Sequence, residues 1–295
     1  MKTILLTGVT GQVGQELKDI LPQMGKVIAV NRQIMDLTQA EQIKDLISKI
    51  KPDIIVNSAA YTAVDKAETE VKLAEAINAI APSIMAREAE KIGATLIQIS
   101  TDYVFDGTKP TPYVEDDITA PLGIYGKSKL RGEQAVRENC RKHIILRTAW
   151  VYGCRGHSNF VKTMLRLGAE KEQLQVVSDQ IGSPTWAKDI AQTIGKLIQA
   201  LDSENPLDYG TYHFTNSGVA SWYDFAVTIF ATAQKMGLPL KIKQVLPITT
   251  ADYPTPAPRP AFSVLSNQKI TAALGEYAPH WQVSLRQMLK ELTKN

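Results

Sequence analysis

Short, continuously apolar runs alternate with amphipathic stretches through the first 150 residues, and this alternation leaves few folds open. A run that is apolar at every position must be covered on both faces, as a strand is in a parallel sheet with helices on either side. We therefore predict an α/β fold with a Rossmann-like, doubly wound parallel sheet. The expected strands are Thr3–Thr7, Val27–Val30, Ile54–Val56, Thr95–Ile99 and Ile144–Arg147, and the expected helices between them are Val13–Leu21, Ala40–Ile50, Ala74–Ile92 and Tyr125–Asn139.

After about residue 150 the alternation becomes irregular, and prolines gather in the loops, above all in Pro254–Pro260. We expect a Rossmann domain over residues 1–150 and a smaller α/β substrate lobe over residues 151–295. One helix of the second half, Ala187–Leu201, is expected to return to the first domain within a segment near residues 185–205. Further helices are predicted at Asn159–Leu167, Ser221–Met236 and Ser284–Leu292.

The composition argues against several classes of function. The 33 basic and 30 acidic residues are scattered, which gives no electrostatic case for binding nucleic acid. No apolar run approaches the roughly 20 residues of a membrane span, and the chain starts directly with a strand, which leaves no signal peptide to remove. Cys140 and Cys154 have neither metal-site spacing nor a disulfide framework, and the four histidines lie far apart. We expect a cytoplasmic protein without a bound metal.

A glycine-rich turn separates the first strand from the first helix. Gly8, Gly11 and Gly14 have GxxGxxG spacing, and the turn also contains Gln12 and Val13. Glycines let the backbone approach a pyrophosphate, and the helix N-terminus then provides N–H donors and the positive end of its dipole. A plain tight turn would show the same spacing, but the position between strand and helix favours a dinucleotide site.

The residues after the second strand bear on the choice of cofactor. Asn31 and Arg32 stand where an acidic residue usually binds the ribose hydroxyls. Asn31 would not repel a 2′-phosphate and Arg32 could clamp one, although Arg32 could equally be a solvated surface residue. We predict NADPH, or both NADPH and NADH. Further cofactor contacts are expected from Asp36, Leu37, Ala59, Ala60 and Tyr61.

A tyrosine and a lysine in the later part of the first domain suggest the chemistry. Tyr125 and Lys129 lie four residues apart and therefore share one helix face. A lysine there can favour the phenolate and lower the pKa of the tyrosine from about 10, so that Tyr125 can exchange a proton with a carbonyl oxygen. Thr101, after the fourth strand, could donate a hydrogen bond to the same oxygen. The order of glycine turn, hydroxyl and tyrosine–lysine pair indicates hydride transfer at a carbon bearing oxygen.

This order resembles the extended short-chain dehydrogenase/reductase family, and within it the chain is similar to the dTDP-4-dehydrorhamnose reductases. The resemblance covers nearly the whole chain, and the Trp-Val-Tyr, Gly-Ser-Pro-Thr and Pro-Arg-Pro segments are its most specific parts. The segments that carry it are Asn57–Glu68, Ser100–Gly107, Tyr125–Glu133, Arg147–Tyr152, Asp179–Thr185 and Tyr253–Pro260.

The resemblance implies NAD(P)H-dependent reduction of the C4 keto group of dTDP-4-dehydro-β-L-rhamnose to dTDP-L-rhamnose. It makes Tyr125 the proton donor and Lys129 its partner, which also holds the nicotinamide ribose, and it gives Thr101 the hydroxyl position. Asn31-Arg32 departs from the family pattern, in which many relatives carry an acid. Some relatives dimerise around Mg²⁺; a homodimer is possible here, but no matching carboxylate cluster is established. The expected substrate contacts are Thr101, Asp102, Trp150, Asn159 and Arg259.

Four of these substrate contacts have plainer interpretations. Trp150 could be core, Asp102 could cap a turn, Asn159 could cap the next helix, and Arg259 could lie on the surface. For Arg259 we favour a substrate role, because a diphosphate needs cationic partners and a proline-stiffened loop positions one well.

Two other functions stay open at this point. One is another nucleotide-sugar epimerase, dehydratase or reductase of the same superfamily, although Tyr103 follows Asp102 where dehydratases typically carry a second acid. The other is a non-catalytic regulatory subunit, similar to that of methionine adenosyltransferase.

Overall fold

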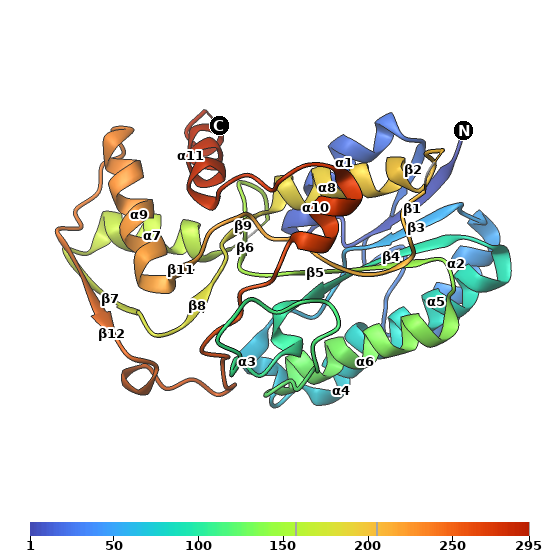
Figure 1. Cartoon of the computed structure of the whole chain (residues 1–295), viewed down its shortest axis with the longest axis horizontal. Helices are drawn as coiled ribbons and strands as arrows, with labels where there is room; N and C mark the ends of the chain where they lie inside the picture. The colour runs from blue at the N-terminus through green and yellow to red at the C-terminus, as the bar shows by residue number, and fades with distance from the viewer. Residues whose placement is uncertain (157, 205, 295) are drawn as a thin grey trace.

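A six-stranded parallel sheet forms the centre of the protein, and its strand order is β10-β5-β4-β3-β1-β2. The structure, a computed structural model, describes residues 1–156, 158–204 and 206–294. The predicted α/β class and parallel sheet are confirmed. The strands are β1 (Thr3–Thr7), β2 (Lys26–Ala29), β3 (Ile54–Asn57), β4 (Thr95–Thr101), β5 (His143–Thr148) and β10 (Gly210–His213) (Figure 1).

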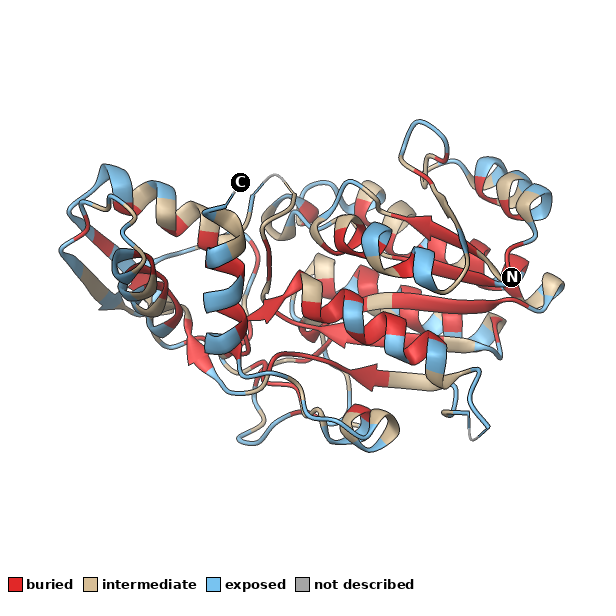
Figure 2. Cartoon of the chain, turned by 90° about the horizontal axis from the view of Figure 1, so that it is seen from above, coloured by how far each residue is buried: buried red, intermediate tan, exposed pale blue. Residues whose placement is uncertain are grey.

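Helices cover both faces of this sheet because its strands are apolar on both sides. Along β1, Ile4 and Leu6 face one apolar core, and Leu5 between them faces the other. The first core is closed by α1 (Gln12–Ile20), α8 (Ala187–Ala200) and α10 (Gln268–Leu274), and the second by α2 (Ala40–Ile50), α5 (Ala81–Ile92) and α6 (Ile124–Asn139). Figure 2 shows the strands of the sheet as mostly buried.

The long helix expected at Ala74–Ile92 is interrupted by a wide π turn. It consists of α4 (Val71–Glu75), the π segment η2 (Ala76–Ile80) and α5. Pro82 has no N–H to give to the carbonyl of Asn78, four residues before it, so the ordinary α-helical bond cannot form there. The carbonyl of Asn78 instead lies against α6, where a Cβ on Gly132 would come within 2.1 Å of it.

Whereas α8, β10 and α10 belong to the central sheet and its covering core, other parts of the second half of the chain form a smaller lobe beyond the carboxyl ends of the strands (Figure 1). Its core contains Phe225, Phe230, Trp281 and Leu285. The lobe is built from α7 (Phe160–Glu170), α9 (Trp222–Lys235), α11 (Trp281–Leu292) and three strand pairs, β7 (Gln173–Val177) with β12 (Gln244–Ile248), β6 (Val151–Tyr152) with β9 (Thr185–Trp186), and β8 (Ile181–Gly182) with β11 (Ala220–Ser221).

Several elements were not expected from the sequence. They are short or interrupted, and β12 contains Pro247, so neither length nor periodicity marks them. The unexpected elements include β10, α10 and the three strand pairs of the second lobe, together with α3 (Val64–Ala67) and the 3₁₀ turns η1 (Leu21–Gln23), η3 (Asp102–Val104) and η4 (Thr250–Asp252).

Within the described ranges, none of the helices is long and apolar enough to cross a membrane.

Helix α8 packs against α1 although about 170 residues separate the two in the sequence. Ile194 of α8 is fully buried in the shared core. We expect Ile194→Ala to lower the free energy of unfolding by about 2–5 kcal/mol, because truncation removes buried surface and leaves a cavity. Urea unfolding followed by circular dichroism measures this change.

Ile118→Ala is the matched control, because Ile118 is 90% exposed and its loss should change stability by less than about 0.5 kcal/mol. An equally small effect at Ile194 would mean that α8 contributes nothing to the core beneath α1.

Candidate active site

A cavity of about 730 Å³ lies where the carboxyl ends of the parallel strands meet the second lobe. In open α/β sheets this edge is the place where ligands bind. Of the site residues predicted from the sequence, the cavity wall contains Gly8, Gly11, Gln12, Val13, Asn31, Arg32, Asp36, Leu37, Ala59, Ala60, Thr101, Asp102, Tyr125, Lys129 and Trp150. Gly14, Tyr61, Asn159 and Arg259 lie outside the wall.

The glycine turn brings backbone against backbone at one end of the cavity. Gly8 has a φ of +71°, and a Cβ there would come within 2.5 Å of the backbone nitrogen of Ala59. A Cβ on Gly14 would come within 2.1 Å of the carbonyl oxygen of Gly8. Gly14 therefore lets α1 pack closely against the glycine turn, although it does not line the cavity itself. No side chain caps the start of α1 at Gly11. The first N–H groups of α1 are therefore available to an anionic group such as a pyrophosphate.

The side chains after β2 form the outer rim of this end of the cavity. The Arg32 side chain is 75% exposed, and its Nε lies 3.2 Å from Oδ2 of Asp36. Hydrogen bonds, first from the backbone N–H of Thr38, hold the pKa of Asp36 below its ordinary value. Asn31 caps its own turn by accepting hydrogen bonds from the N–H groups of Gln33 and Ile34. Of these three side chains, only Arg32 brings a positive charge.

Tyr125 and Lys129 project from the first two turns of α6 toward the carboxyl end of β4. Lys129 Nζ donates a 2.6 Å hydrogen bond to the carbonyl oxygen of Ile99. Thr101 Oγ1 donates to Asp102 Oδ1 at 3.0 Å, accepts from the N–H of Tyr103 and lies in hydrogen-bond contact with Tyr125. The structure thus brings the three predicted catalytic side chains together.

Burial changes the protonation of this pair in a way the sequence analysis did not anticipate. Burial raises the pKa of Tyr125 to about 12, and the hydroxyl of Thr101 opposes the rise. Burial also lowers the pKa of Lys129 to about 8. The prediction that Lys129 lowers the pKa of Tyr125 is wrong for this structure, because desolvation dominates and the ammonium group donates to Ile99 instead. Tyr125 therefore carries its proton at neutral pH and can act as an acid.

Three buried polar atoms in the cavity wall have no hydrogen-bond partner among the described residues. They are Oγ of Ser100, Oδ2 of Asp102 and Oγ1 of Thr148. Burial raises the pKa of Asp102 to about 6, while hydroxyls of Ser263 and Thr101 act in the opposite direction. Buried polar groups are normally satisfied, so these three atoms indicate where polar groups of a ligand would bind. The sequence analysis singled out Asp102 but missed Thr148, the register partner of Thr101 across β4 and β5.

Trp150 forms a flat wall at the junction with the second lobe. Its φ of +47° lies in the left-handed region, and its ring stacks on Trp222 with a centroid distance of 3.5 Å and an interplanar angle of 4°. A Cβ on Gly182 would come within 2.4 Å of the indole. Trp150 therefore packs against the second lobe's core and also faces the cavity, and its contact with a substrate stays a prediction.

Arg259 and Asn159 lie next to the cavity with their side chains already engaged. Arg259 makes a two-pronged ion pair with Asp65 of α3, at 2.6 and 2.8 Å. Asn159 caps α7 by accepting from the N–H of Lys162, and its amide donates to Gln12 Oε1 at 2.8 Å. The capping interpretation of Asn159 therefore describes its local geometry, and its amide also orients a cavity residue.

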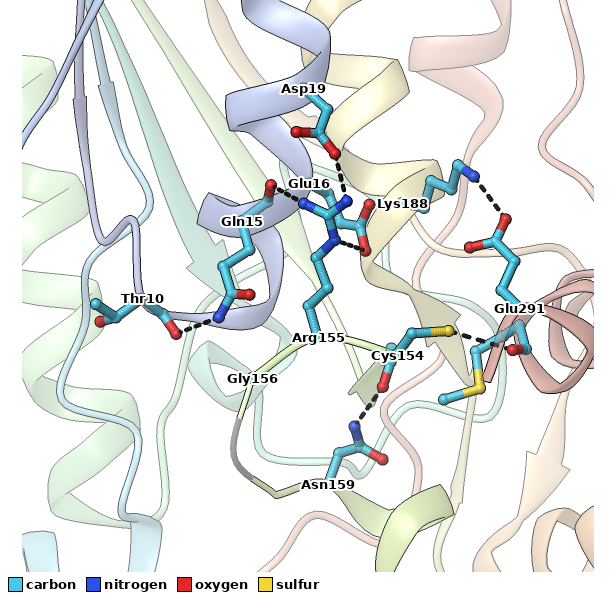
Figure 3. Close-up of polar contacts among 12 residues, drawn as sticks. Thr10, Gln15, Glu16, Asp19, Cys154, Arg155, Gly156, Asn159, Lys188 and Glu291 are labelled. Atoms are coloured by element: carbon cyan, nitrogen blue, oxygen red, sulfur yellow. Dashed lines mark hydrogen bonds and ion pairs between the residues drawn. The ribbon is translucent and has the colours of Figure 1, made fainter. Parts of the chain in front are cut away.

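Arg155 fastens the chain segment beyond β6 to the first turns of α1 (Figure 3). Its guanidinium donates to the carbonyl of Gln15 at 2.8 Å and pairs with Asp19 and Glu16. The next residue, Gly156, lies in the cavity wall so close to Gln12 that a Cβ would come within 2.8 Å of that side chain. The sequence analysis missed Arg155, since no motif marks it.

Asn78 in the π turn is a further residue that the sequence analysis missed. Its side chain accepts from the N–H of Tyr61 at 2.9 Å and donates to the carbonyl of Tyr61 and to Ser128 Oγ. Ser128 in turn donates to the carbonyl of Tyr125 at 2.8 Å. Asn78 therefore joins the loop after β3 to the helix that carries Tyr125. The sequence shows only an asparagine four residues before Pro82, and its burial and hydrogen bonds are known from the structure alone.

In the part of the chain that the structure describes, no group of three or more His, Cys, Asp or Glu side chains is arranged to hold a metal ion.

Comparison with known proteins identifies close relatives over the full length. The family described as RmlD substrate binding domain matches residues 1–294. The chain is 44% identical to the dTDP-4-dehydrorhamnose reductase of Escherichia coli (strain K12), covering 98% of this chain and 97% of that protein. It is 45% identical to the spore coat polysaccharide biosynthesis protein SpsK of Bacillus subtilis (strain 168), with coverage of 99% and 98%.

A solved structure agrees with these relatives. The crystal structure of dTDP-4-dehydrorhamnose reductase from Bacillus anthracis str. Ames in complex with NADP is similar with a TM-score of 0.91 and 40% identity, covering 98% of this chain and 99% of that one.

Proposed function

This chain belongs to the dTDP-4-dehydrorhamnose reductase family, and on that premise we propose that it reduces the C4 keto group of dTDP-4-dehydro-β-L-rhamnose to form dTDP-L-rhamnose, with NADPH or NADH as the reductant. The observation that carries the proposal is one cavity that contains both an uncapped glycine turn and the cluster of Tyr125, Lys129 and Thr101. The first feature fits a dinucleotide and the second fits a carbonyl group.

The residues at the glycine turn fit the cofactor. The N–H groups at the start of α1 would bind the pyrophosphate, with Gly8 and Gly14 permitting the close approach. When bound, the nicotinamide provides the hydride. Arg32 would pair with the 2′-phosphate of NADPH, because its side chain is exposed at the rim and, among the described residues, forms its one ion pair with Asp36. Leu37, Ala59 and Ala60 line the same part of the wall, and Tyr61, outside the wall, stays a predicted contact.

Tyr125 is proposed to give its proton to the substrate oxygen as negative charge develops there. With a pKa of about 12 it is protonated throughout the neutral range, which is the form an acid needs. The Thr101 hydroxyl, which donates to Asp102 Oδ1 in this structure, would rotate to donate its hydrogen bond to the same oxygen, and the Lys129 ammonium adds a positive charge beneath the site. Because these donors are fixed by β4 and α6 before the substrate arrives, little reorganisation is needed in the transition state.

Arg259 is proposed to provide charge for the substrate's diphosphate. Among the described residues, the only Lys or Arg side chains in the cavity wall are Arg32 and Lys129, and both have roles toward the cofactor or the carbonyl. Arg259 lies in contact with Tyr103, which is itself a wall residue. Its two-pronged geometry on Asp65 is also the geometry with which arginine binds phosphate.

Two further substrate contacts are proposed for residues that line the cavity. Trp150 offers a flat apolar surface to the sugar, and the unpaired oxygen of Asp102 offers an acceptor to a sugar hydroxyl. Contact of Asn159 with the substrate stays a prediction, since its amide here caps α7.

The proposal also includes location and assembly. We place the enzyme in the cytoplasm, where both of its free thiols, Cys140 and Cys154, would stay reduced. A homodimer and the lack of a nucleic-acid partner stay predictions.

Replacement of Tyr125 by phenylalanine tests the proposed reaction. Tyr125→Phe keeps the ring and removes the proton, so kcat should fall by at least about 100-fold, while the affinity for NADPH changes little. The assay follows NADPH oxidation in the presence of freshly made dTDP-4-dehydrorhamnose. Tyr277→Phe, at an exposed tyrosine, is the control and should keep wild-type activity. Turnover by the Tyr125 variant within a few-fold of wild type would exclude Tyr125 as the acid.

Replacement of Arg32 tests the choice of cofactor. Arg32→Ala should lower kcat/KM for NADPH about tenfold or more and change that for NADH much less, because only NADPH carries the 2′-phosphate. Arg166→Ala is a matched control, since Arg166 also pairs with an acid four residues later, at the surface of α7. Equal losses with both cofactors would show that Arg32 does not contact that phosphate.

Replacement of Arg259 tests the substrate end of the cavity. Arg259→Ala should raise KM for the dTDP-sugar about tenfold or more and leave KM for NADPH nearly unchanged. Asp65→Asn removes the ion pair but keeps the arginine, so it should raise KM for the dTDP-sugar much less. If both variants raised this KM equally, the pair would act only by holding the proline-rich loop in place.

A further inference from the structure

We propose that Glu133 is a positioning residue for this reaction, whose buried carboxylate, fixed by Arg147, keeps the Lys129 ammonium charged and in place beneath Tyr125. The inference rests on the proposed reductase function and extends it to a charge that does not touch the cavity.

Three functional groups are spaced evenly along one face of α6. Tyr125, Lys129 and Glu133 follow each other at intervals of four residues, so each lies about one turn from the next. Lys129 Nζ donates to the carbonyl of Ile99, and the side chain of the following residue, Ser100, lies in contact with Glu133. The ammonium group and the carboxylate therefore lie under the same end of β4.

Arg147 fixes the orientation of this carboxylate from the neighbouring strand. Its Nε donates to Glu133 Oε1 at 2.9 Å and its Nη2 donates to Oε2 at 2.7 Å. Ser100 and Arg147 are register partners across β4 and β5, which places the guanidinium directly beside the same strand end. Arg137 also reaches Oε2, at 3.2 Å, from the outer side of α6.

Stability alone is a weak reason for such a pair. Glu133 is only 1% exposed and Arg147 is equally buried, so both charges have lost their hydration. A buried ion pair often contributes no more stability than apolar side chains of similar size. A role in setting the charge of a neighbour explains why ionised groups stand at this position.

The charges around Lys129 support this role. Burial lowers the pKa of Lys129 to about 8, and the Glu133 carboxylate opposes that fall. Lys129 shares the cavity wall with Tyr125, Thr101 and Asp102, and Glu133 pairs with Arg147 of β5 outside that wall. His213 of β10, beside Arg147, stays neutral because burial lowers its pKa to about 3. Without Glu133, Lys129 would lose its proton near neutral pH.

The test is the pH dependence of kcat/KM, which reports ionisations of the free enzyme. In the wild type, the profile should fall above about pH 8, where Lys129 loses its proton. Glu133→Gln should shift this falling limb of the kcat/KM profile to a pH that is lower by about one unit or more, because the carboxylate is lost while the Arg147 cation remains. Glu133→Asp keeps the charge and should restore the limb toward the wild-type position.

Two further variants separate this effect from a folding defect. The double variant Glu133→Gln with Arg147→Met removes both charges and leaves no unpaired ion, so the limb should move down by less than in Glu133→Gln alone. Glu138→Gln, at an exposed position of the same helix, should leave the profile unchanged. A limb that stays at the wild-type pH in folded Glu133 variants with reduced activity would overturn the proposal.

A measurement that does not depend on turnover distinguishes a failure of this inference from a failure of the proposed function. The ¹³Cε signal of Lys129 in isotope-labelled enzyme, assigned with a Lys129→Arg variant, titrates with the pKa of its ammonium group. We expect this pKa to fall in Glu133→Gln even if the sugar substrate is different. An unchanged titration would refute the role of Glu133, whereas a shifted titration without NADPH turnover would refute only the proposed reaction.

Discussion

Backbone contact at the glycine turn determines where every other part of the site can lie. Gly14 lies on the carbonyl of Gly8, and Gly8 lies on the loop after β3, so helix α1, strand β1 and that loop meet closely, with the Ser58 hydroxyl group packed beside both glycines. This contact directs the uncapped start of α1 into the cavity. The same helix also binds the segment that leads into the second lobe, because Arg155 contacts Gln15 and Asp19 of α1.

The catalytic helix has two different environments along one face. Tyr125 faces the cavity, Lys129 lies beneath it, and Glu133 reaches a charge network in the interior. Two close contacts fix α6 against the π turn. The carbonyl of Asn78 packs against Gly132, and the side chain of Asn78 donates a hydrogen bond to Ser128. The lack of a side chain at Gly132 and the wide turn at Pro82 therefore have the same effect, which is to place Tyr125 relative to β4.

Much of the first lobe could be predicted from the sequence because its strands are continuously apolar and are separated by amphipathic helices. The expected range Ala40–Ile50 is the range of α2, and Thr3–Thr7 is the range of β1. Strand β10 could not be predicted, since Gly210–His213 is short and gains its apolar surroundings only from β5 and α10. The same holds for the strand pairs of the second lobe, which are defined by partners distant in sequence.

For the candidate site, sequence motifs indicated which residues gather but not how they are charged or paired. The glycines, Tyr125, Lys129 and Thr101 are local motifs, and the structure puts them around one cavity except for Gly14 behind it. The pKa of Tyr125 depends on the dielectric around the ring, which no spacing encodes. The pairing of Arg259 with Asp65 joins the proline-rich loop to helix α3, about 190 residues earlier in the chain, so only the fold brings the two together.

The position of β10 at the edge of the central sheet affects how the chain folds while it is being synthesised on the ribosome. The other five strands of the central sheet and the cluster of Tyr125, Lys129 and Thr101 are all synthesised by residue 148, yet the edge of β5 stays uncovered until residues 210–213 emerge. Helix α8, which closes one core, also arrives after residue 186. A nascent chain of about 150 residues therefore exposes an unpaired strand edge and an open apolar face, the two features that attract chaperones and promote aggregation.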